Sequence, residues 1–159
     1  MRSALIITLL VLASCATVAS SLQYTQGSKA LEDGDFEKAA VLLAEAVRLD
    51  PEVSRNRNNL AAALFELGRV EEGWPHVRKA VLLDPRNDSA ALNCKRYFVT
   101  LLKKAKLDVG STKADVVRVL GQPDDSLVQG RCTWFQYGSS AVCFEGERFA
   151  GVQDMERAT

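Results

Sequence analysis

The sequence predicts an α+β protein: a short α-α superhelix of two repeats plus a closing helix, followed by a small module of one helix and a three-stranded antiparallel sheet. Residues 46–51 (AVRLDP) recur 34 positions later as residues 80–85 (AVLLDP). Apolar residues stand at helical spacing in residues 36–49 and 56–67, which predicts helices with one buried face. Beyond Pro123 the apolar residues instead fall in short β-type runs bounded by glycine.

The composition is that of a soluble globular chain, with one ordinary domain or two small ones in 159 residues. Hydrophobic residues make up 47% and charged residues 25% of the chain, which excludes wholesale disorder. Twenty Lys and Arg balance twenty Asp and Glu. Because there is no excess of cations, general nucleic-acid binding is not expected.

Catalytic and metal-binding patterns are missing from the sequence. His76 is the only histidine, which excludes multi-histidine metal sites and argues against a Ser-His-Asp or Cys-His device. The closest carboxylate pair, Asp124-Asp125, lies in a predicted turn, where Asp is ordinary. We therefore expect no enzymatic activity, no cofactor, no bound metal and no small-molecule substrate.

Residues 1–14 are predicted to be a signal peptide outside the fold. Arg2 supplies a positive charge and residues 4–13 (ALIITLLVLA) form an apolar run, as in secretory signals. Counted generously to Ala19, the apolar span is still shorter than the roughly 20 residues of a transmembrane helix. An uncleaved anchor is the alternative, and residues 15–22 would form the link to the fold.

Residues 12–15 (LASC) resemble the bacterial lipobox. That resemblance implies that Cys15 becomes the first mature residue and carries acyl chains, which hold a protein at a membrane. By the sorting rule of that family, Ala16 in place of Asp implies the outer membrane, with the protein facing the periplasm. The alternative is ordinary cleavage, for example after Ala16 or Ala19, which would give a soluble periplasmic or secreted protein.

Residues 23–107 resemble the tetratricopeptide repeat family. A 34-residue period is typical of this helix–turn–helix unit, and Gly34 and Gly68 fall at the turns between paired helices. A closing helix over residues 89–107 would end the array. Since fewer than three such repeats seldom stand alone, we expect the C-terminal residues to cover the end of the array.

One local conflict stands in the second repeat, at Gly73-Trp74-Pro75. Pro75 lacks an amide donor, so it is expected to kink the second helix or to delay its start. Trp74 is interpreted as a packing residue beside it.

In this family the concave face, lined by the first helix of each unit, holds extended peptides. Asn59 and Asn93 are again 34 residues apart, at the position where related domains grip a ligand's backbone with an amide. Arg55 and Arg96 could meet a carboxylate. The resemblance thus implies a peptide site, and the alternative is a solvated polar face. The candidate residues are Tyr24, Ser28, Arg55, Asn59, Ala62, Asn93 and Arg96.

Residues 108–159 are predicted to form the separate C-terminal module. Thr112 and Asp115 suit a capping box that opens a short helix, and Gly121 and Pro123 end it. Three β-type runs follow and should pair as an antiparallel meander. They cover residues 131–137, 141–145 and 149–153.

Over residues 107–153 this module resembles the SmpA/OmlA family of outer-membrane lipoproteins. The shared elements are the helix entry at 107–112 (LDVGST), the exit at 120–123 (LGQP) and strand residues 133–135 (TWF) and 142–144 (VCF). The family includes the small lipoprotein of the outer-membrane β-barrel assembly machinery, but its small members lack a preceding repeat array. The resemblance implies an envelope module that binds proteins or lipid headgroups.

Three cysteines remain beyond the predicted lipid anchor. An oxidising compartment favours a disulfide between Cys132 and Cys143, which lie in adjacent predicted strands. A hairpin loop at Tyr137-Gly138 would place them directly opposite, whereas a register shifted by two would leave both thiols free. Cys94 is expected to be a small buried core residue. Because there is no Cys-x-x-Cys motif, a thiol-redox protein is only a remote alternative.

Together these features predict a non-enzymatic envelope lipoprotein. It would act as an adaptor that binds an envelope protein or peptide through its concave face, while the lipid on Cys15 fixes it at a membrane. The alternative is a structural or assembly factor for outer-membrane proteins in which the C-terminal module is the working surface.

Overall fold

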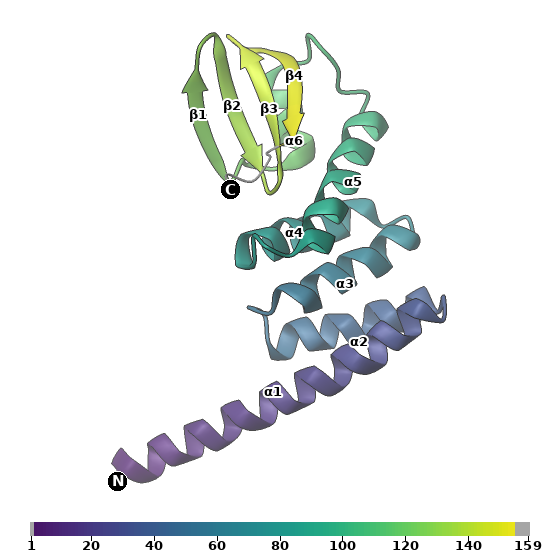
Figure 1. Cartoon of the computed structure of the whole chain (residues 1–159), viewed down its shortest axis with the longest axis vertical. Helices are drawn as coiled ribbons and strands as arrows, with labels where there is room; N and C mark the ends of the chain where they lie inside the picture. Colours follow the sequence, from purple (N-terminus) through teal and green to yellow (C-terminus); the bar gives the residue numbers. More distant parts are fainter. Residues whose placement is uncertain (1, 155–159) are drawn as a thin grey trace.

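The structure, a computed structural model, describes the backbone of residues 2–154 and the side chains of residues 17–153. Over that range six helices precede a four-stranded antiparallel sheet, so the predicted α+β class is confirmed. Figure 1 shows α1 to α4 stacked in succession, with α5 rising from the stack toward α6 and the sheet. The helices are α1 (Arg2–Glu32), α2 (Phe36–Leu49), α3 (Ser54–Glu66), α4 (Val70–Leu83), α5 (Asp88–Lys104) and α6 (Lys113–Leu120). The strands are β1 (Asp125–Gln129), β2 (Cys132–Tyr137), β3 (Ser140–Glu145) and β4 (Arg148–Asp154).

Two helical hairpins, α1–α2 and α3–α4, make up the repeats. Gly34 and Gly68 lie in their turns with φ angles of 80° and 72°, as the sequence predicts. Asp35 caps α2 by accepting a hydrogen bond from the Lys38 N–H at 3.2 Å. The apolar faces of α1, α2 and α3 close into one cluster, in which Leu43 is fully buried.

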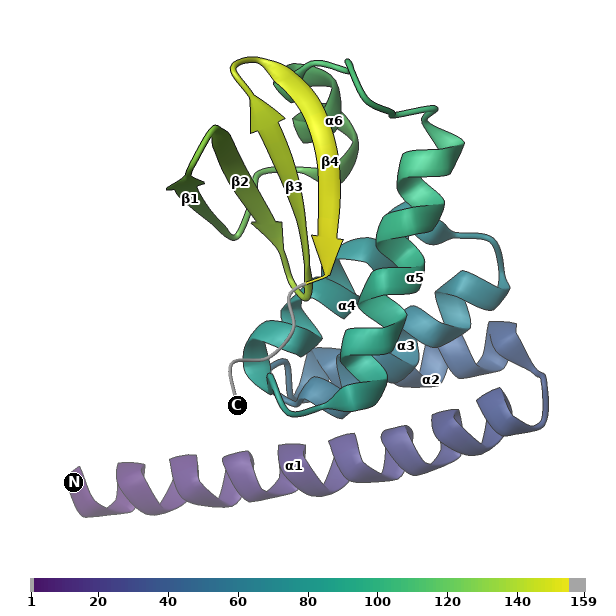
Figure 2. The same cartoon turned by 45° about the horizontal axis from the view of Figure 1, so that its top comes forward.

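A pair of serine hydrogen bonds marks where each repeat begins. Ser20 Oγ donates to the Ala46 carbonyl at 3.0 Å, and Ser54 Oγ, 34 residues later, donates to the Ala80 carbonyl at 2.8 Å. Because Ser54 opens α3, the first repeat starts near Ser20, and the earlier part of α1 extends beyond the array (Figures 1 and 2). The predicted signal peptide and the side chain of Cys15 lie outside the described side chains. Among the described residues, no helix is both long and apolar enough to cross a membrane.

Helix α4 begins at Val70 in spite of Pro75. Its start is therefore not delayed, because Pro75 stands near the N-terminal end, where the helix loses a single hydrogen bond. Trp74 is 5% exposed and packs in the core, as predicted. Gly73 is the contact point with α5, since a Cβ on Gly73 would lie only 1.8 Å from the Tyr97 hydroxyl.

The sheet runs in the order β1-β2-β3-β4, with neighbouring strands antiparallel. The prediction of three strands was wrong because it omitted β1, whose sequence opens with Asp and Ser; Asp is depleted in strands. Its turn was nevertheless visible in the sequence. Gly130, Gly138 and Gly146 recur every eight residues and open three two-residue turns with φ angles of 63°, 61° and 60°, as type II′ hairpin turns require.

The register of β2 and β3 also differs from the prediction. Tyr137 pairs with Ser140 around the turn Gly138-Ser139. The expected turn at Tyr137-Gly138 was therefore displaced by one residue, which shifts the register by two. Gly138, with its positive φ, is the residue that a type II′ turn needs first.

A disulfide joins Cys132 and Cys143 in this shifted register, and their Cα atoms are 5.3 Å apart. Cys132 lies opposite Glu145 and Cys143 lies opposite Trp134, so the two cysteines are diagonal neighbours. The expectation that this register would leave both thiols free was wrong. The reason is that strand twist brings one diagonal pair of same-face side chains together.

The sheet and α6 share one hydrophobic core with α4 and α5. The rings of Trp74 on α4, Phe98 on α5 and Tyr137 on β2 meet with centroids 6.4 to 6.5 Å apart. Burial raises the pKa of Tyr137 to about 12. The C-terminal module therefore covers the end of the helical array with apolar side chains.

Arg78 of α4 fastens the loop after α6 to the array. Its guanidinium pairs with Asp124, and each of these side chains is 14% exposed. It also donates to the carbonyls of Leu120 at 3.0 Å and Gln122 at 2.9 Å, and it lies over the Trp74 ring, 5.5 Å from the centroid. The array and the module are thus joined by a polar staple as well as by the shared core.

Candidate peptide-binding face

All seven residues predicted for peptide binding lie on α1, α3 and α5. These are the first helices of the two repeats and the closing helix, and α3 contacts both of the others (Figure 2). We call this surface the first-helix face. Its seven residues are half-buried or exposed: Tyr24 and Ser28 on α1, Arg55, Asn59 and Ala62 on α3, and Asn93 and Arg96 on α5.

A ladder of side-chain hydrogen bonds crosses the first-helix face. Asn93 Nδ2 donates to Asn58 Oδ1 at 2.9 Å, and Asn58 Nδ2 donates to Asn59 Oδ1 at 3.3 Å. Asn59 Nδ2 in turn donates to Ser28 Oγ at 3.0 Å. The two asparagines that the sequence singled out are therefore connected, and the connection runs through three helices.

The ladder leaves hydrogen-bonding capacity on both predicted asparagines. A side-chain amide has two N–H donors and a carbonyl with two lone pairs. Asn93 uses one donor in the ladder, while Asn59 uses one donor and one lone pair. Each amide thus keeps a donor and an acceptor, and its rotamer is fixed by its neighbours. A bound peptide backbone also offers one donor and one acceptor per residue.

Asn58 is the member of this ladder that the sequence analysis missed. It is 6% exposed, so the polar amide is buried and needs the partners that it has. A signal was present in the sequence, because Asn58 precedes Leu60 and Ala61 on the apolar side of a predicted helix. A polar residue among such neighbours indicates a buried hydrogen-bond network.

Two guanidinium groups flank the ladder, and each lies over an aromatic ring. Arg55 stands 4.9 Å from the centroid of Tyr24, and Arg96 stands 4.5 Å from that of Phe65. Arg96 also forms an ion pair with Glu66 at 3.7 Å, and the two side chains are 49% and 43% exposed. Exposed pairs of this kind contribute little stability, so the carboxylate of a ligand can replace Glu66.

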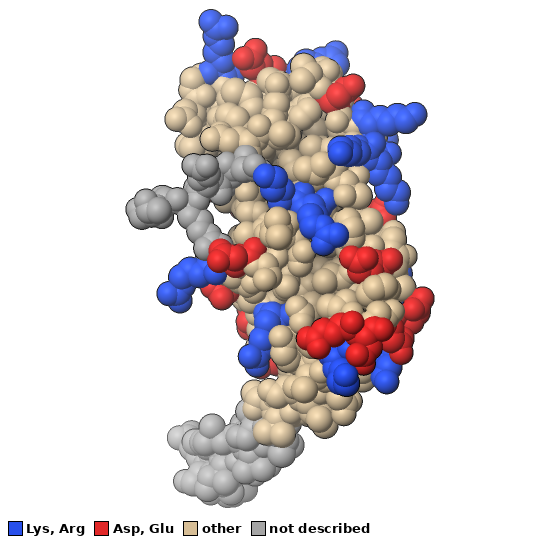
Figure 3. All heavy atoms as spheres, turned by 45° about the vertical axis from the view of Figure 1, so that its right-hand side comes forward, with Lys and Arg blue, Asp and Glu red and all other residues tan. Residues whose placement is uncertain are grey.

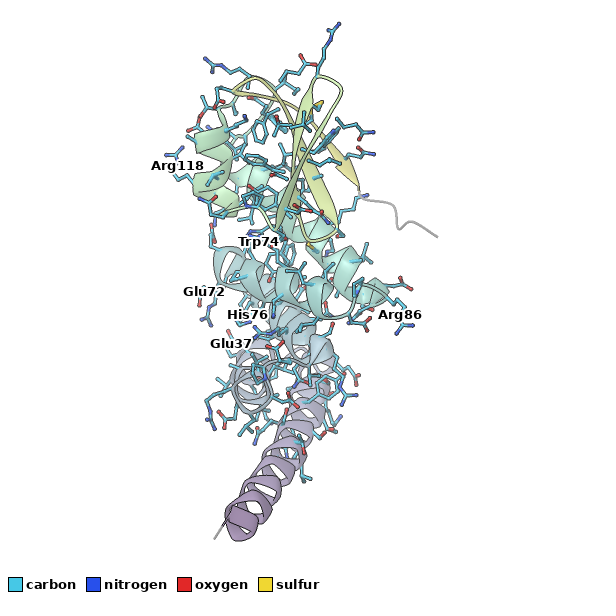
Figure 4. All side chains as sticks on the ribbon, turned by 90° about the vertical axis from the view of Figure 1, so that its left-hand side faces the viewer. Glu37, Glu72, Trp74, His76, Arg86 and Arg118 are labelled. Atoms are coloured by element: carbon cyan, nitrogen blue, oxygen red, sulfur yellow. A yellow bond between two sulfur atoms is a disulfide. The ribbon has the colours of Figure 1, made fainter. Side chains whose placement is uncertain are left out.

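A separate hollow of about 380 Å³ lies between α2 and α4, above Leu60 of α3. Figure 4 shows three of its lining residues, Glu37, Glu72 and His76, on one side of the molecule. Burial, with a smaller contribution from Arg57, lowers the pKa of His76. Within residues 17–153, no cluster of three or more His, Cys, Asp and Glu side chains could hold a metal ion.

The described free cysteine, Cys94, lies away from the first-helix face. Its thiol is buried on α5 and contacts the carbonyl of Tyr137 at 3.7 Å. Burial raises the pKa of the Cys94 thiol, which keeps it protonated and unreactive toward the disulfide. A packing role for Cys94 therefore agrees with its surroundings.

Comparison with known proteins identifies the helical part. Residues 30–92 match the tetratricopeptide repeat family. The solved structure of the Arabidopsis OM64 TPR domain is similar with a TM-score of 0.53 and 26% identity, over 57% of this chain and 74% of that chain. The predicted repeats are therefore confirmed, and repeats of this family are generally non-enzymatic modules for protein–protein interaction.

A curated relative extends the similarity. Protein SGT1 homolog from rice (Oryza sativa subsp. japonica) is 29% identical over 122 residues, which cover 72% of this chain and 33% of that protein. The chain thus spans about a third of the length of this relative. The lipobox and the SmpA/OmlA resemblance stay predictions.

Proposed function

We propose that this protein is an adaptor of the bacterial cell envelope that holds an extended segment of a partner protein on its first-helix face. The observation that carries the proposal is the asparagine ladder, in which Asn59 and Asn93 each keep one donor and one acceptor. Since the ladder is already formed in the free protein, little side-chain entropy is lost when a peptide binds.

The charges of the array favour a segment that carries a carboxylate. Arg55 and Arg96 stand at the two sides of the ladder, and both are exposed. In Figure 3, Lys and Arg side chains cover the part of the surface near α5 and the C-terminal module, while Asp and Glu gather at the α1–α2 end. We therefore expect the acidic part of the partner segment to lie toward α5.

Site-specific photo-crosslinking in membranes of the native host tests this proposal. A photoreactive phenylalanine analogue replaces Ala62, at the centre of the first-helix face, or Val41 on α2, which is 71% exposed, as the control. Position 62 should capture a partner, and the double change N59A/N93A should reduce that capture at least about tenfold. Capture through Val41 alone, or capture that ignores N59A/N93A, would show that the first-helix face is not the binding surface.

The membrane anchor is part of the proposal. Support comes from the lipobox-like LASC at residues 12–15 and from the repeat, which starts near Ser20, shortly after it. The intact mass of the protein from native membranes should correspond to a chain that begins at Cys15, carries acyl chains and lacks the two hydrogens of a disulfide. A bare polypeptide that begins after Ala16 or Ala19 would instead make the protein soluble in the periplasm or secreted.

One observation favours the second candidate, a structural or assembly factor that works through the C-terminal module. Trp134 of β2 is half-buried on the outer face of the sheet and pairs with Leu127 of β1, which is 61% exposed. The photo-crosslinking probe placed at Leu127 measures this alternative in the same membranes. Capture at Leu127 that survives N59A/N93A, with none at Ala62, would favour it.

A further inference from the structure

The two edges of the sheet are not equivalent. On β4, Phe149 N–H donates to the Ser111 carbonyl at 2.7 Å, and the Phe149 carbonyl accepts from Gly110 N–H at 2.8 Å. The pairing of β3 with β4 also shifts between Cys143 and Phe144, which is a β-bulge. A covered and bulged edge does not accept a further strand.

The edge at β1 has none of these protections. All five residues of β1 are exposed, and Val128 is 73% exposed. In the part of the chain that the structure describes, no segment pairs with the outer side of β1. It contains neither Lys nor Pro, the residues that usually blunt an edge. Figures 1 and 2 show that β1 lies at the side of the sheet away from α5, so the array does not cover it.

The turn after β1 determines which backbone groups face outward. Gly130-Arg131 is a two-residue turn, so the flanking pair, Gln129 and Cys132, is a hydrogen-bonded pair. Hydrogen-bonded and non-hydrogen-bonded pairs alternate along the strands. The N–H and C=O groups of Gln129 and Leu127 therefore point toward β2, and those of Val128 point outward.

The charges at this edge are complementary to themselves. Asp125 and Arg131 lie three residues before and three residues after Val128. Because side chains alternate along a strand, both belong to the face that carries Leu127. In the described part of the chain, neither residue forms an ion pair with another side chain; Asp125 accepts from the N–H of Ser126 at 2.7 Å.

We propose that β1 is the interface of a homodimer, in which a two-fold axis through Val128 joins two sheets edge to edge. Val128 would then exchange both backbone hydrogen bonds with Val128 of the second copy. Each Asp125 would lie directly opposite Arg131 of the second copy, in a non-hydrogen-bonded pair, where side chains come closest. The occupant of the edge is thus a second copy of this chain, because the charges match at both ends only in that arrangement.

Charge reversal tests the proposal in the full chain. Native mass spectrometry of the protein released from detergent should show a dimer, since the contact is small and charge-dependent. D125R and R131D should each weaken the dimer about tenfold or more, and D125R/R131D should restore it, because the swapped charges again face each other. Circular dichroism checks that the variants, changed only at exposed positions, remain folded. A wild-type protein that stays monomeric, or a double variant no better than the single ones, overturns the proposal.

Cysteine crosslinking in membranes provides the second measurement. V128C should give a covalent homodimer with a short bismaleimide. V152C on β4, at a position where Val152 is 53% exposed, is the matched control and should give at least about tenfold less. Equal yields from the two variants, or a V128C product that contains a different protein instead of a second copy, would contradict the homodimer. Neither measurement depends on a bound peptide, so the result is independent of the proposed adaptor function.

Discussion

At the scale of single residues, the closest packing in the array lies between Gly73 and Tyr97. Tyr97 is 1% exposed, and its hydroxyl donates to the Ala61 carbonyl of α3. The first repeat has Ala39 at the position of Gly73, 34 residues earlier. The second repeat needs glycine here because the tyrosine ring crosses over its backbone.

Gly73→Ala should therefore destabilise the protein by about 2 kcal/mol, because an added Cβ overpacks the contact and displaces the Tyr97 hydroxyl. The better helix propensity of alanine offsets part of this cost. Urea unfolding measures the change. Gly151→Ala is the control, since a Cβ at Gly151 meets no atom within 4 Å. Equal midpoints for the two variants would show that the contact at Gly73 is not tight.

His76 is a second residue whose surroundings have a measurable consequence. Burial lowers its pKa, so the unfolded chain binds the proton more tightly than the folded one. The folded state should therefore lose stability as the pH falls below about 6.5, the ordinary histidine value. In His76→Leu the urea midpoint should change less between pH 7.5 and pH 5 than in the wild type. Parallel pH profiles for the two proteins would mean that His76 does not contribute.

At the scale of elements, the junction between α4 and the C-terminal module depends on Arg78. Its partner Asp124 also accepts a hydrogen bond from Gly138 N–H at 2.6 Å. One carboxylate therefore connects α4 with the turn between β2 and β3. Because both charged side chains are largely buried, removing one leaves the other without its counter-charge.

Arg78→Ala should lower the free energy of unfolding by about 3 kcal/mol. Arg48→Ala is the matched control, because Arg48 is 68% exposed and pairs with Glu45 three residues away on the same helix. That change should cost less than about 1 kcal/mol. Denaturant unfolding gives both values, and similar losses in the two variants would remove Arg78 from its role as the staple.

At the scale of the whole molecule, the helical array and the sheet depend on each other. Trp74, Phe98 and Leu101 are at most 5% exposed and belong to the same core as Val142 and Phe144 of the sheet. Two repeats and a closing helix do not bury these side chains without a cover. The module thus replaces the further repeats that other arrays use.

A chain that ends at Lys106 should therefore not fold like the full protein. Without the cover, the exposed apolar surface of α4 and α5 should cause aggregation, or helices that melt without a cooperative transition. Circular dichroism on heating, with light scattering, measures both effects. A truncated chain that melts as sharply as the full one, at the same temperature, would contradict this dependence.

Local patterns in the sequence determined a large part of this structure. The 34-residue offset located both repeats, and Thr112 and Asp115 form the predicted capping box of α6. Gly34 and Gly68 lie in the predicted turns. Such features depend on residues close together in the chain, so their spacing alone determines them.

Only the tertiary structure decided the asparagine ladder, the Arg78–Asp124 pair, strand β1 and the diagonal disulfide. Asn58 and Asn93 are 35 residues apart in the chain, and Arg78 and Asp124 are 46 apart. Many polar side chains in the sequence have the right chemistry for such pairs. Which of them meet depends on how helices and strands pack, and the register of a hairpin changes with one residue of its turn. The sequence therefore determined the elements of this protein, and packing determined the contacts that make its surfaces.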